Sequence, residues 1–177
     1  MIFRETKLRG AFVLEPERFE DERGFFAHGW SPVELAKYGL EAPLAESAIS
    51  FNKKKGTLRG MHYQAAPHGQ IKIVRCTMGA IYDVIVDLRN DSPTFRQWFG
   101  VELTETNRLM LYVPSDFAHG FQTLEDETEL CYHMSRPYAP ESAGGVRWND
   151  PAFNISWPLP VSIMAERDNT YPDFPAL

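Results

Sequence analysis

The sequence predicts an all-β fold, a sandwich or barrel, formed by a single domain over residues 1–177. From residue 45 onward, short stretches alternate between apolar and polar residues, as strands with one buried face do. Gly, Pro, Asn and Asp fall between these stretches, and no helical segments alternate with them. The expected strands span residues 45–51, 57–64, 71–76, 81–88, 97–103, 108–113, 119–124 and 129–134.

The ends of the chain follow different patterns. Residues 3–14 predict an opening strand, or two short ones broken at Gly10, and residues 20–26 predict a turn followed by two aromatic residues. Residues 31–40 are the clearest helix, because Ser31 stands at the N-cap, Pro32 at the first helical position and Glu34 where a capping box needs it. An irregular tail is expected for residues 158–177, which contain several prolines.

Composition limits the classes of function. Hydrophobic residues make up 44% and charged residues 24%, as in ordinary soluble domains. The net charge of −6 argues against general nucleic-acid binding, although a local basic pocket could still hold phosphates. No apolar run reaches membrane-spanning length and the first residues lack a signal-peptide core, so we expect a cytoplasmic protein without a membrane partner. Cys76 and Cys131 have no metal-type spacing and are expected to be reduced.

The stretch over residues 57–75 holds the main candidates for chemistry. Arg59, His62 and Lys72 lie on two predicted strands joined by a Pro- and Gly-rich connection. A base and two cations held on rigid strands could support proton chemistry on an anionic substrate. By composition alone, a surface hairpin with ordinary basic residues is the favoured interpretation of this stretch.

Strand parity adds a tyrosine to the candidates. Leu130, Tyr132 and Met134 share one face of their strand, which predicts that Tyr132 points into the interior. A buried tyrosine hydroxyl needs a partner, either structural or chemical. His133 falls on the opposite, solvated face, and His119 either lines the interior or caps a turn.

Several short motifs together resemble one known family. They are DERGFF at 21–26, LRGMHYQ at 58–64, QIKIVR at 70–75, DVIVDLR at 83–89, SPTF at 92–95, FAHGF at 117–121, RWNDP at 147–151 and ISWPL at 155–159. In this order they resemble the dTDP-4-dehydrorhamnose 3,5-epimerase family, nucleotide-sugar epimerases of the cupin superfamily. The resemblance implies a jelly-roll β-barrel, a homodimer and an enzyme that needs no metal or redox cofactor.

The resemblance also implies a mechanism, namely inversion at C3, C5 or both in a nucleotide-linked 4-keto-6-deoxy sugar. His62 matches the family's base, and Asp168 matches the aspartate that pairs with it. Lys72 matches the cation that faces the developing enolate. Tyr132 matches the acid that returns a proton from the opposite face of the sugar.

Further matches concern substrate binding. Arg23 and Arg59 match positions that contact the nucleotide diphosphate, a group that arginine recognises well. His119 matches a histidine that lines the site, and Tyr138 matches a tyrosine that stacks on the base.

The sequence departs from the family at other binding positions. A gapless alignment puts Ser47, Ile49 and Phe51 where the family has glutamine, asparagine and serine, and His28 where it has a glutamate that recognises thymine across the dimer. These changes predict an altered substrate preference, such as a GDP- or CDP-linked sugar. The alternative is that neighbouring residues compensate and dTDP is retained.

Two other classes of function stay open. A metal-dependent cupin would use His62 and His119 as ligands, but Gln64 stands where such cupins have a second histidine of an HxH pair. A catalytically silent module that only binds sugar nucleotides is the other alternative.

Overall fold

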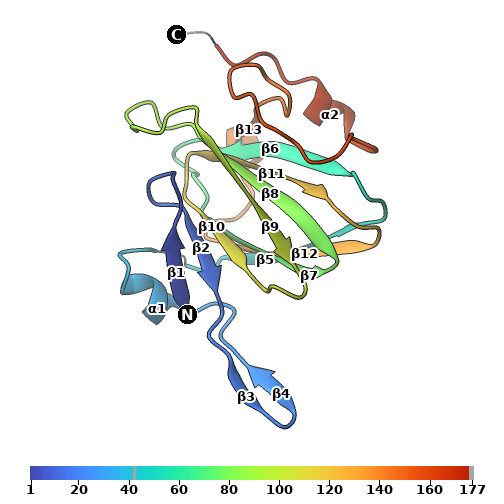
Figure 1. The fold of residues 1–177 in the computed structure, drawn as a ribbon. Coiled ribbons are helices and arrows are strands. Elements are labelled where there is room, and N and C mark those ends of the chain that lie inside the picture. Colours follow the sequence, from blue (N-terminus) through green and yellow to red (C-terminus); the bar gives the residue numbers. More distant parts are fainter. Residues whose placement is uncertain (42, 176–177) are drawn as a thin grey trace.

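The structure, a computed structural model, describes residues 1–41 and 43–175, and within them two antiparallel sheets face each other (Figure 1). The larger sheet has the order β1 (Ile2–Glu5), β2 (Phe12–Glu15), β10 (Met110–Val113), β7 (Lys72–Met78), β12 (Thr128–Met134), β5 (Glu46–Asn52). The smaller sheet has the order β13 (Ala143–Gly145), β6 (Leu58–Gln64), β11 (Phe117–Thr123), β8 (Ala80–Asp87), β9 (Trp98–Thr104). This two-layer arrangement is the cupin-type jelly roll that the sequence predicted.

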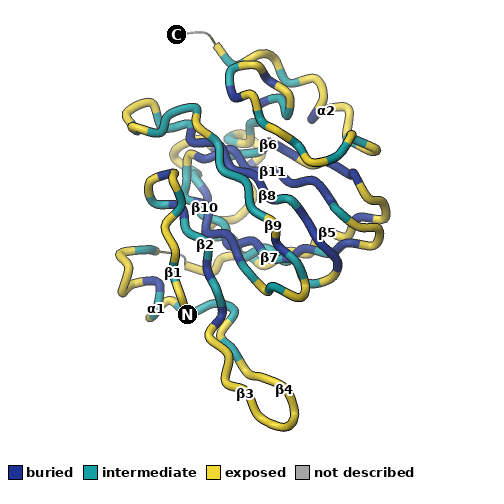
Figure 2. Tube along the Cα trace, viewed as in Figure 1, coloured by how far each residue is buried: buried dark blue, intermediate teal, exposed yellow. Residues whose placement is uncertain are grey.

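The core fills the space between the two sheets. Val74 and Leu130 of the larger sheet pack in one cluster with Ile81 and Ile85 of the smaller one, and all four are almost fully buried. Burying each such side chain contributes about 1.5–3 kcal/mol. Strands β8 and β11 are buried along nearly their whole length (Figure 2). The packed half of the sandwich is therefore a firm support for side chains that point into its open half.

The predicted strands are confirmed, with ends that shift by at most two residues. The opening segment forms two strands, paired as an antiparallel hairpin from Ile2 with Glu15 to Glu5 with Phe12. The helix is shorter than expected, because α1 covers Pro32–Ala36 and the following residues form a turn. None of the helices in the described ranges is long and apolar enough to cross a membrane.

The capping box at α1 forms only on one side. Ser31 Oγ accepts a hydrogen bond from the Glu34 backbone N–H at 3.3 Å, as predicted. The Glu34 carboxylate does not return to the cap; it accepts a hydrogen bond at 2.6 Å from the α-ammonium group of Met1 instead. The stronger charged partner outcompetes the neutral backbone group.

Two predictions of irregular structure are corrected. Residues 20–26 belong to a hairpin of β3 (Phe19–Asp21) and β4 (Gly24–Phe26), which projects away from the sandwich and is exposed (Figures 1 and 2). The tail is not wholly irregular, because it contains the short helix α2 (Glu166–Asn169).

A buried carboxylate at the end of β8 holds the loop between β8 and β9 by hydrogen bonds. Asp87, fully buried, accepts hydrogen bonds from Arg89 Nη2 at 2.7 Å, from Ser92 Oγ at 2.6 Å and from Thr94 Oγ1 at 2.6 Å. Burial opposes ionisation of Asp87, but these hydrogen bonds outweigh it and lower the pKa of the carboxyl group to about 2. The SPTF motif therefore has a structural role in this chain.

We expect Asp87→Asn to lower the free energy of unfolding at neutral pH by about 2 kcal/mol. The folded-state pKa lies below the unfolded one, so this stability is present above about pH 4 and is lost between about pH 4 and 2. Urea denaturation across this pH range measures it. As the pH falls from about 4 to 2, the free energy of unfolding should decrease less for the variant than for the wild type. If the wild type exceeded the variant in free energy of unfolding by the same amount at pH 2 and at pH 7, the prediction would be contradicted.

Candidate active site

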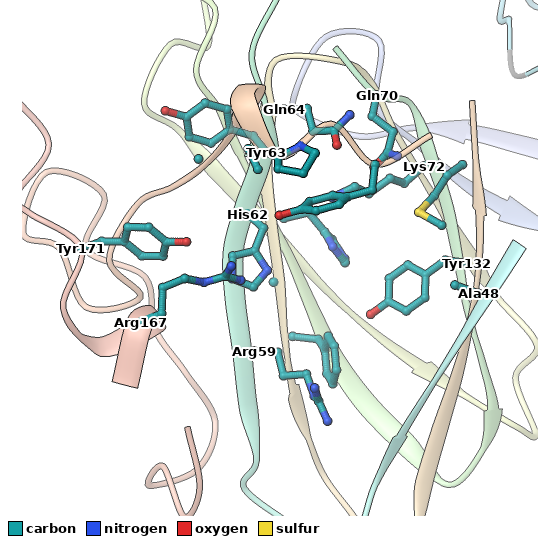
Figure 3. Close-up of a pocket in the computed structure, with 18 residues that line it drawn as sticks. Ala48, Arg59, His62, Tyr63, Gln64, Gln70, Lys72, Tyr132, Arg167 and Tyr171 are labelled. Carbon is teal, nitrogen blue, oxygen red and sulfur yellow. The ribbon is translucent and has the colours of Figure 1, made fainter. Parts of the chain in front are cut away.

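A cavity of about 500 Å³ opens between the two sheets (Figure 3). The larger sheet contributes side chains from β5, β7 and β12, and the smaller sheet contributes side chains from β6, β11 and β13. The lining includes Ala48, Arg59, His62, Gln64, Lys72, His119, Tyr132, Tyr138, Arg167 and Tyr171.

His62 on β6 forms a pair with Asp168 on α2. His62 Nε2 lies 2.8 Å from Asp168 Oδ1, and Asp168 Oδ2 accepts a hydrogen bond from the Gly60 backbone N–H at 3.0 Å. Burial opposes ionisation of Asp168, but the hydrogen bonds from His62 and Gly60 outweigh it and hold the pKa of this carboxyl group below its usual value. A carboxylate that accepts from Nε2–H leaves Nδ1 of the imidazole as the basic nitrogen.

An irregularity in β6 brings Arg59 and His62 to the same cavity. In a regular strand, residues three apart point to opposite faces. Here the register against β11 shifts between the pair His62–His119 and the pair Arg59–Phe121, so two residues of β6 lie opposite Gly120 alone. The strands approach so closely that a Cβ on Gly60 would lie 2.5 Å from Gly120 Cα, and Gly60 also has φ of +128°. Glycine is required there.

The deep end of the cavity gathers Lys72, His119 and Tyr132 around Asp83. His119 Nε2 lies 2.7 Å from Asp83 Oδ1, while Asp83 Oδ2 is buried without a hydrogen-bond partner among the described residues. The His119 and Tyr132 rings stand edge to face with centroids 6.0 Å apart. His62 and Tyr132 belong to different sheets and extend into the cavity from different sides (Figure 3).

Lys72 and Tyr132, which the larger sheet contributes to the cavity, have perturbed pKa values. Burial lowers the pKa of Lys72 to about 8, although the charge of Asp83 opposes the shift. Lys72 is therefore mainly a cation at neutral pH. Burial, with a further contribution from Asp83, raises the pKa of Tyr132 well above its ordinary value. Tyr132 thus keeps its proton at neutral pH and can donate it.

Strand β12 follows the predicted parity, with one correction. Tyr132 and Met134 both line the cavity, whereas His133 points to the opposite face. His133 is not solvated as expected: it is half-buried, and burial together with the charge of Arg75 lowers its pKa.

The predicted binding residues fall into two groups. Arg59 and Tyr138 line the cavity, and Arg59 Nε is fixed by a 2.7 Å hydrogen bond to Asn52 Oδ1. Arg23 does not line it; it lies in the turn of the projecting β3–β4 hairpin, with 90% of its side chain exposed and a 2.6 Å ion pair with Asp21. His28 lines a separate hollow beneath the same hairpin.

The register of β5 changes which of its residues face the site. Ala48 pairs with Tyr132 and lines the cavity, whereas Ser47 and Ile49 lie on the outer face, and Ile49 is 69% exposed. A shift of one residue moves a strand's whole side-chain set to the other face. The gapless alignment therefore compared the family's polar residues with outward-facing positions, and the geometry gives no support to contacts of Ser47 or Ile49 with a ligand in this cavity.

Sequence reasoning missed several lining residues. Arg167 and Tyr171 flank Asp168 along the chain, which was the one signal available for them. Asp83 lies inside a motif that the resemblance used, but nothing in its spacing indicated contact with His119. Gln64, in place of a metal-ligating histidine, is buried and bonded to backbone groups, including the Ala139 N–H at 2.8 Å.

A jelly roll in which a paired histidine and aspartate share a cavity with a lysine and a protonated tyrosine has the groups that acid–base chemistry requires. The profile of the dTDP-4-dehydrorhamnose 3,5-epimerase family matches residues 5–176. The chain therefore belongs to that family, and it is an isomerase.

Individual relatives agree. The chain is 37% identical over 173 residues to a dTDP-4-dehydrorhamnose 3,5-epimerase of Sinorhizobium fredii, covering 97% of this chain and 89% of the relative. It is similar to the Bacillus anthracis enzyme of the same name, solved with TDP and PPi bound, with a TM-score of 0.93 and 40% identity over 98% of this chain and 99% of that one. A dTDP-4-dehydrorhamnose 3-epimerase of Streptomyces niveus is 36% identical over 170 residues, 95% of this chain and 81% of the relative.

Proposed function

We propose that this protein inverts C3, C5 or both in a nucleotide-linked 4-keto-6-deoxy sugar, without a metal or redox cofactor. The 4-keto group acidifies the C–H bonds on either side of it. His62 removes one of these protons, and the negative charge that moves onto the ketone oxygen is stabilised by the Lys72 ammonium group. Tyr132 donates a proton to the carbon from the other face of the ring, which inverts the centre. Solvent then restores the proton on Tyr132 and takes the one on His62.

One observation supports this assignment above all others. The basic histidine and the protonated tyrosine come from opposite sheets and reach the same cavity, and the half-buried Lys72 lines that cavity from the sheet of the tyrosine. Inversion needs a base and an acid on opposite faces of the sugar, together with a cation near the developing oxyanion. Asp168 holds the imidazole of His62 in one orientation and stabilises the cation that forms on deprotonation.

A dTDP-linked sugar is the proposed substrate, because the relatives carry that name and the geometry of β5 removes the argument from Ser47 and Ile49 for a different nucleotide. His28 is the remaining argument for a different nucleotide. Incubation with dTDP-, GDP- and CDP-linked 4-keto-6-deoxy sugars in deuterated water, followed by NMR, tests the function. Deuterium should enter C3, C5 or both of the dTDP-linked sugar. A protein that exchanges neither position in any of the three sugars would refute the proposal.

The remaining candidates make different predictions in the same assay. A single-carbon epimerase, like the Streptomyces niveus relative by its name, would exchange one position and leave the other. A silent binding module would exchange neither. A metal-dependent cupin would need a ligand set, and no group of three or more His, Cys, Asp or Glu side chains suited to a metal occurs within residues 1–41 and 43–175.

We also propose that the protein works as a homodimer in which Arg23 and His28 serve the partner's cavity. The hairpin that holds Arg23 extends away from its own sandwich, which supports a contact with a second copy (Figure 1). Arg23→Ala should lower kcat/KM about tenfold or more, the usual effect of losing a charge-assisted contact.

A mixed dimer checks this arrangement. Differently tagged Arg23→Ala and His62→Ala chains, co-expressed and purified through both tags, should regain about half the activity of the wild-type dimer. One cavity then has an intact His62 and receives an intact Arg23. If Arg23 acts in its own cavity, the mixed dimer gains nothing over the two single variants. A monomer by light scattering would also contradict the proposal.

A further inference from the structure

The short strand β13 provides a platform for two aromatic rings. A Cβ on Gly144 would lie 2.8 Å from Tyr63 Cζ, and a Cβ on Gly145 would overlap the Tyr171 ring. Neither glycine can carry a side chain unless the ring above it moves. The Tyr171 ring therefore packs directly against the backbone of Gly145. Any side chain at position 145 would push the ring away.

The segment that carries Tyr171 is held on both sides. Before Tyr171, Asn169 Oδ1 accepts a hydrogen bond from Trp148 Nε1 at 3.2 Å. After it, the Phe174 backbone N–H donates to Asp150 Oδ2 at 2.6 Å. A side chain between two such anchors loses little further entropy when it binds a ligand.

Tyr171 presents an unused donor to the cavity. Its ring stands edge to face with His62 at 6.3 Å between centroids, and its hydroxyl points into the cavity on the side of Arg167 (Figure 3). No described residue forms a hydrogen bond with this hydroxyl. Burial raises the pKa of Tyr171 and the charge of Arg167 opposes the rise, so the hydroxyl stays protonated at neutral pH.

The position of Tyr171 identifies the part of the substrate it can reach. The reacting groups lie deep, whereas Tyr138 is 60% exposed and the Arg167 side chain is 64% exposed, so these two mark the mouth. Arg167 and Tyr171 lie on the way from His62 to this mouth, and the group next to the sugar in a sugar nucleotide is the diphosphate. Phosphate oxygens accept hydrogen bonds from both a guanidinium and a phenol.

We propose that the Tyr171 hydroxyl binds the diphosphate of the substrate beside Arg167. Tyr171 is thus a binding residue that acts on affinity and not on proton transfer. This inference rests on the proposed function, because it assumes a sugar nucleotide in the cavity.

The hydroxyl is tested with Tyr171→Phe, with Tyr38→Phe as the matched control. Tyr38 stacks on Phe3 and does not line the cavity. Calorimetry measures the Kd of dTDP and of thymidine, which lacks phosphates. Tyr171→Phe should bind dTDP about tenfold more weakly and thymidine as the wild type does, since a hydrogen bond to a charged group is the only one lost. KM should rise by a similar factor while kcat stays within about twofold.

Gly145→Ala tests the seat of the ring without altering its chemistry. Because the new methyl group displaces the Tyr171 ring, this variant should reproduce the loss of dTDP affinity. The double variant Gly145→Ala/Tyr171→Phe should be no weaker than Tyr171→Phe alone, since both changes remove the same contact. Thermal unfolding verifies that each variant is folded. If Gly145→Ala does not fold, the result for Tyr171→Phe alone decides the inference.

The outcomes separate this inference from the proposed function. Wild-type affinity for dTDP in Tyr171→Phe overturns the inference alone, as does an equal loss for dTDP and thymidine. A wild-type protein that neither binds dTDP nor exchanges a 4-keto sugar overturns the proposed function and the inference with it.

Discussion

Replacing His62 with alanine is expected to abolish deuterium exchange at both C3 and C5 of the substrate. A buried carboxylate sets which nitrogen of His62 is basic, through the 2.8 Å contact between His62 Nε2 and Asp168 Oδ1. General bases contribute about 10²–10⁴-fold, and without deprotonation no later step can occur. NMR in deuterated water measures the loss at each carbon separately.

The matched control is His68→Ala. His68 forms a 2.9 Å hydrogen bond with Ser142 and does not line the cavity, so its removal should leave exchange near the wild-type rate. Asp168→Asn should also slow exchange, because an amide has one acceptor oxygen for the two donors, the Gly60 N–H and His62 Nε2–H, that the carboxylate accepts from. Full exchange in a folded His62→Ala variant would exclude His62 as the base.

Alternation of residues predicts the strands with one buried face, because such a strand leaves a period of two in the sequence. Strands β8 and β11, which are buried along nearly their whole length, are marked instead by short apolar runs between turn residues. The elements that were missed lack this period. The strands β3 and β4 are exposed on both faces and have only three residues each. The helix α2 has four residues and is stabilised by contacts of Asp168 with β6, more than 100 residues away in the chain. Tertiary contacts of this kind leave no local signal.

The site shows the same limit. Nothing local in the sequence indicates that Arg59 and His62 share a face, since a regular strand would separate them and only the shift against β11 joins them. On β5 the sequence prediction was wrong in the opposite way. The gapless alignment assigned the family's binding positions to Ser47 and Ile49, which face away from the cavity. Tyr132 was predicted correctly to face inward because β12 is regular around it. Face assignments are therefore reliable where pairing is regular and fail at bulges and insertions.

Replacing Tyr132 with phenylalanine is expected to separate exchange from inversion. The burial that raises the pKa of Tyr132 keeps its proton in place at neutral pH, which suits an acid that donates from the side opposite His62. Without the hydroxyl, His62 still removes a proton and can return a deuteron to the same face. Deuterium should therefore continue to enter the sugar with retained configuration.

Net inversion in Tyr132→Phe should fall by about 10²–10⁴-fold, the usual contribution of a general acid, while exchange falls much less. One NMR time course in deuterated water gives both rates, because deuterated substrate and inverted product have different ring-proton couplings. Tyr82→Phe is the control, since Tyr82 packs against Gly100 and does not line the cavity. Inversion at the wild-type rate would mean that another group donates the proton. Equal losses of exchange and inversion would mean that Tyr132 assists deprotonation, and either result would reject the division of work between the two sheets.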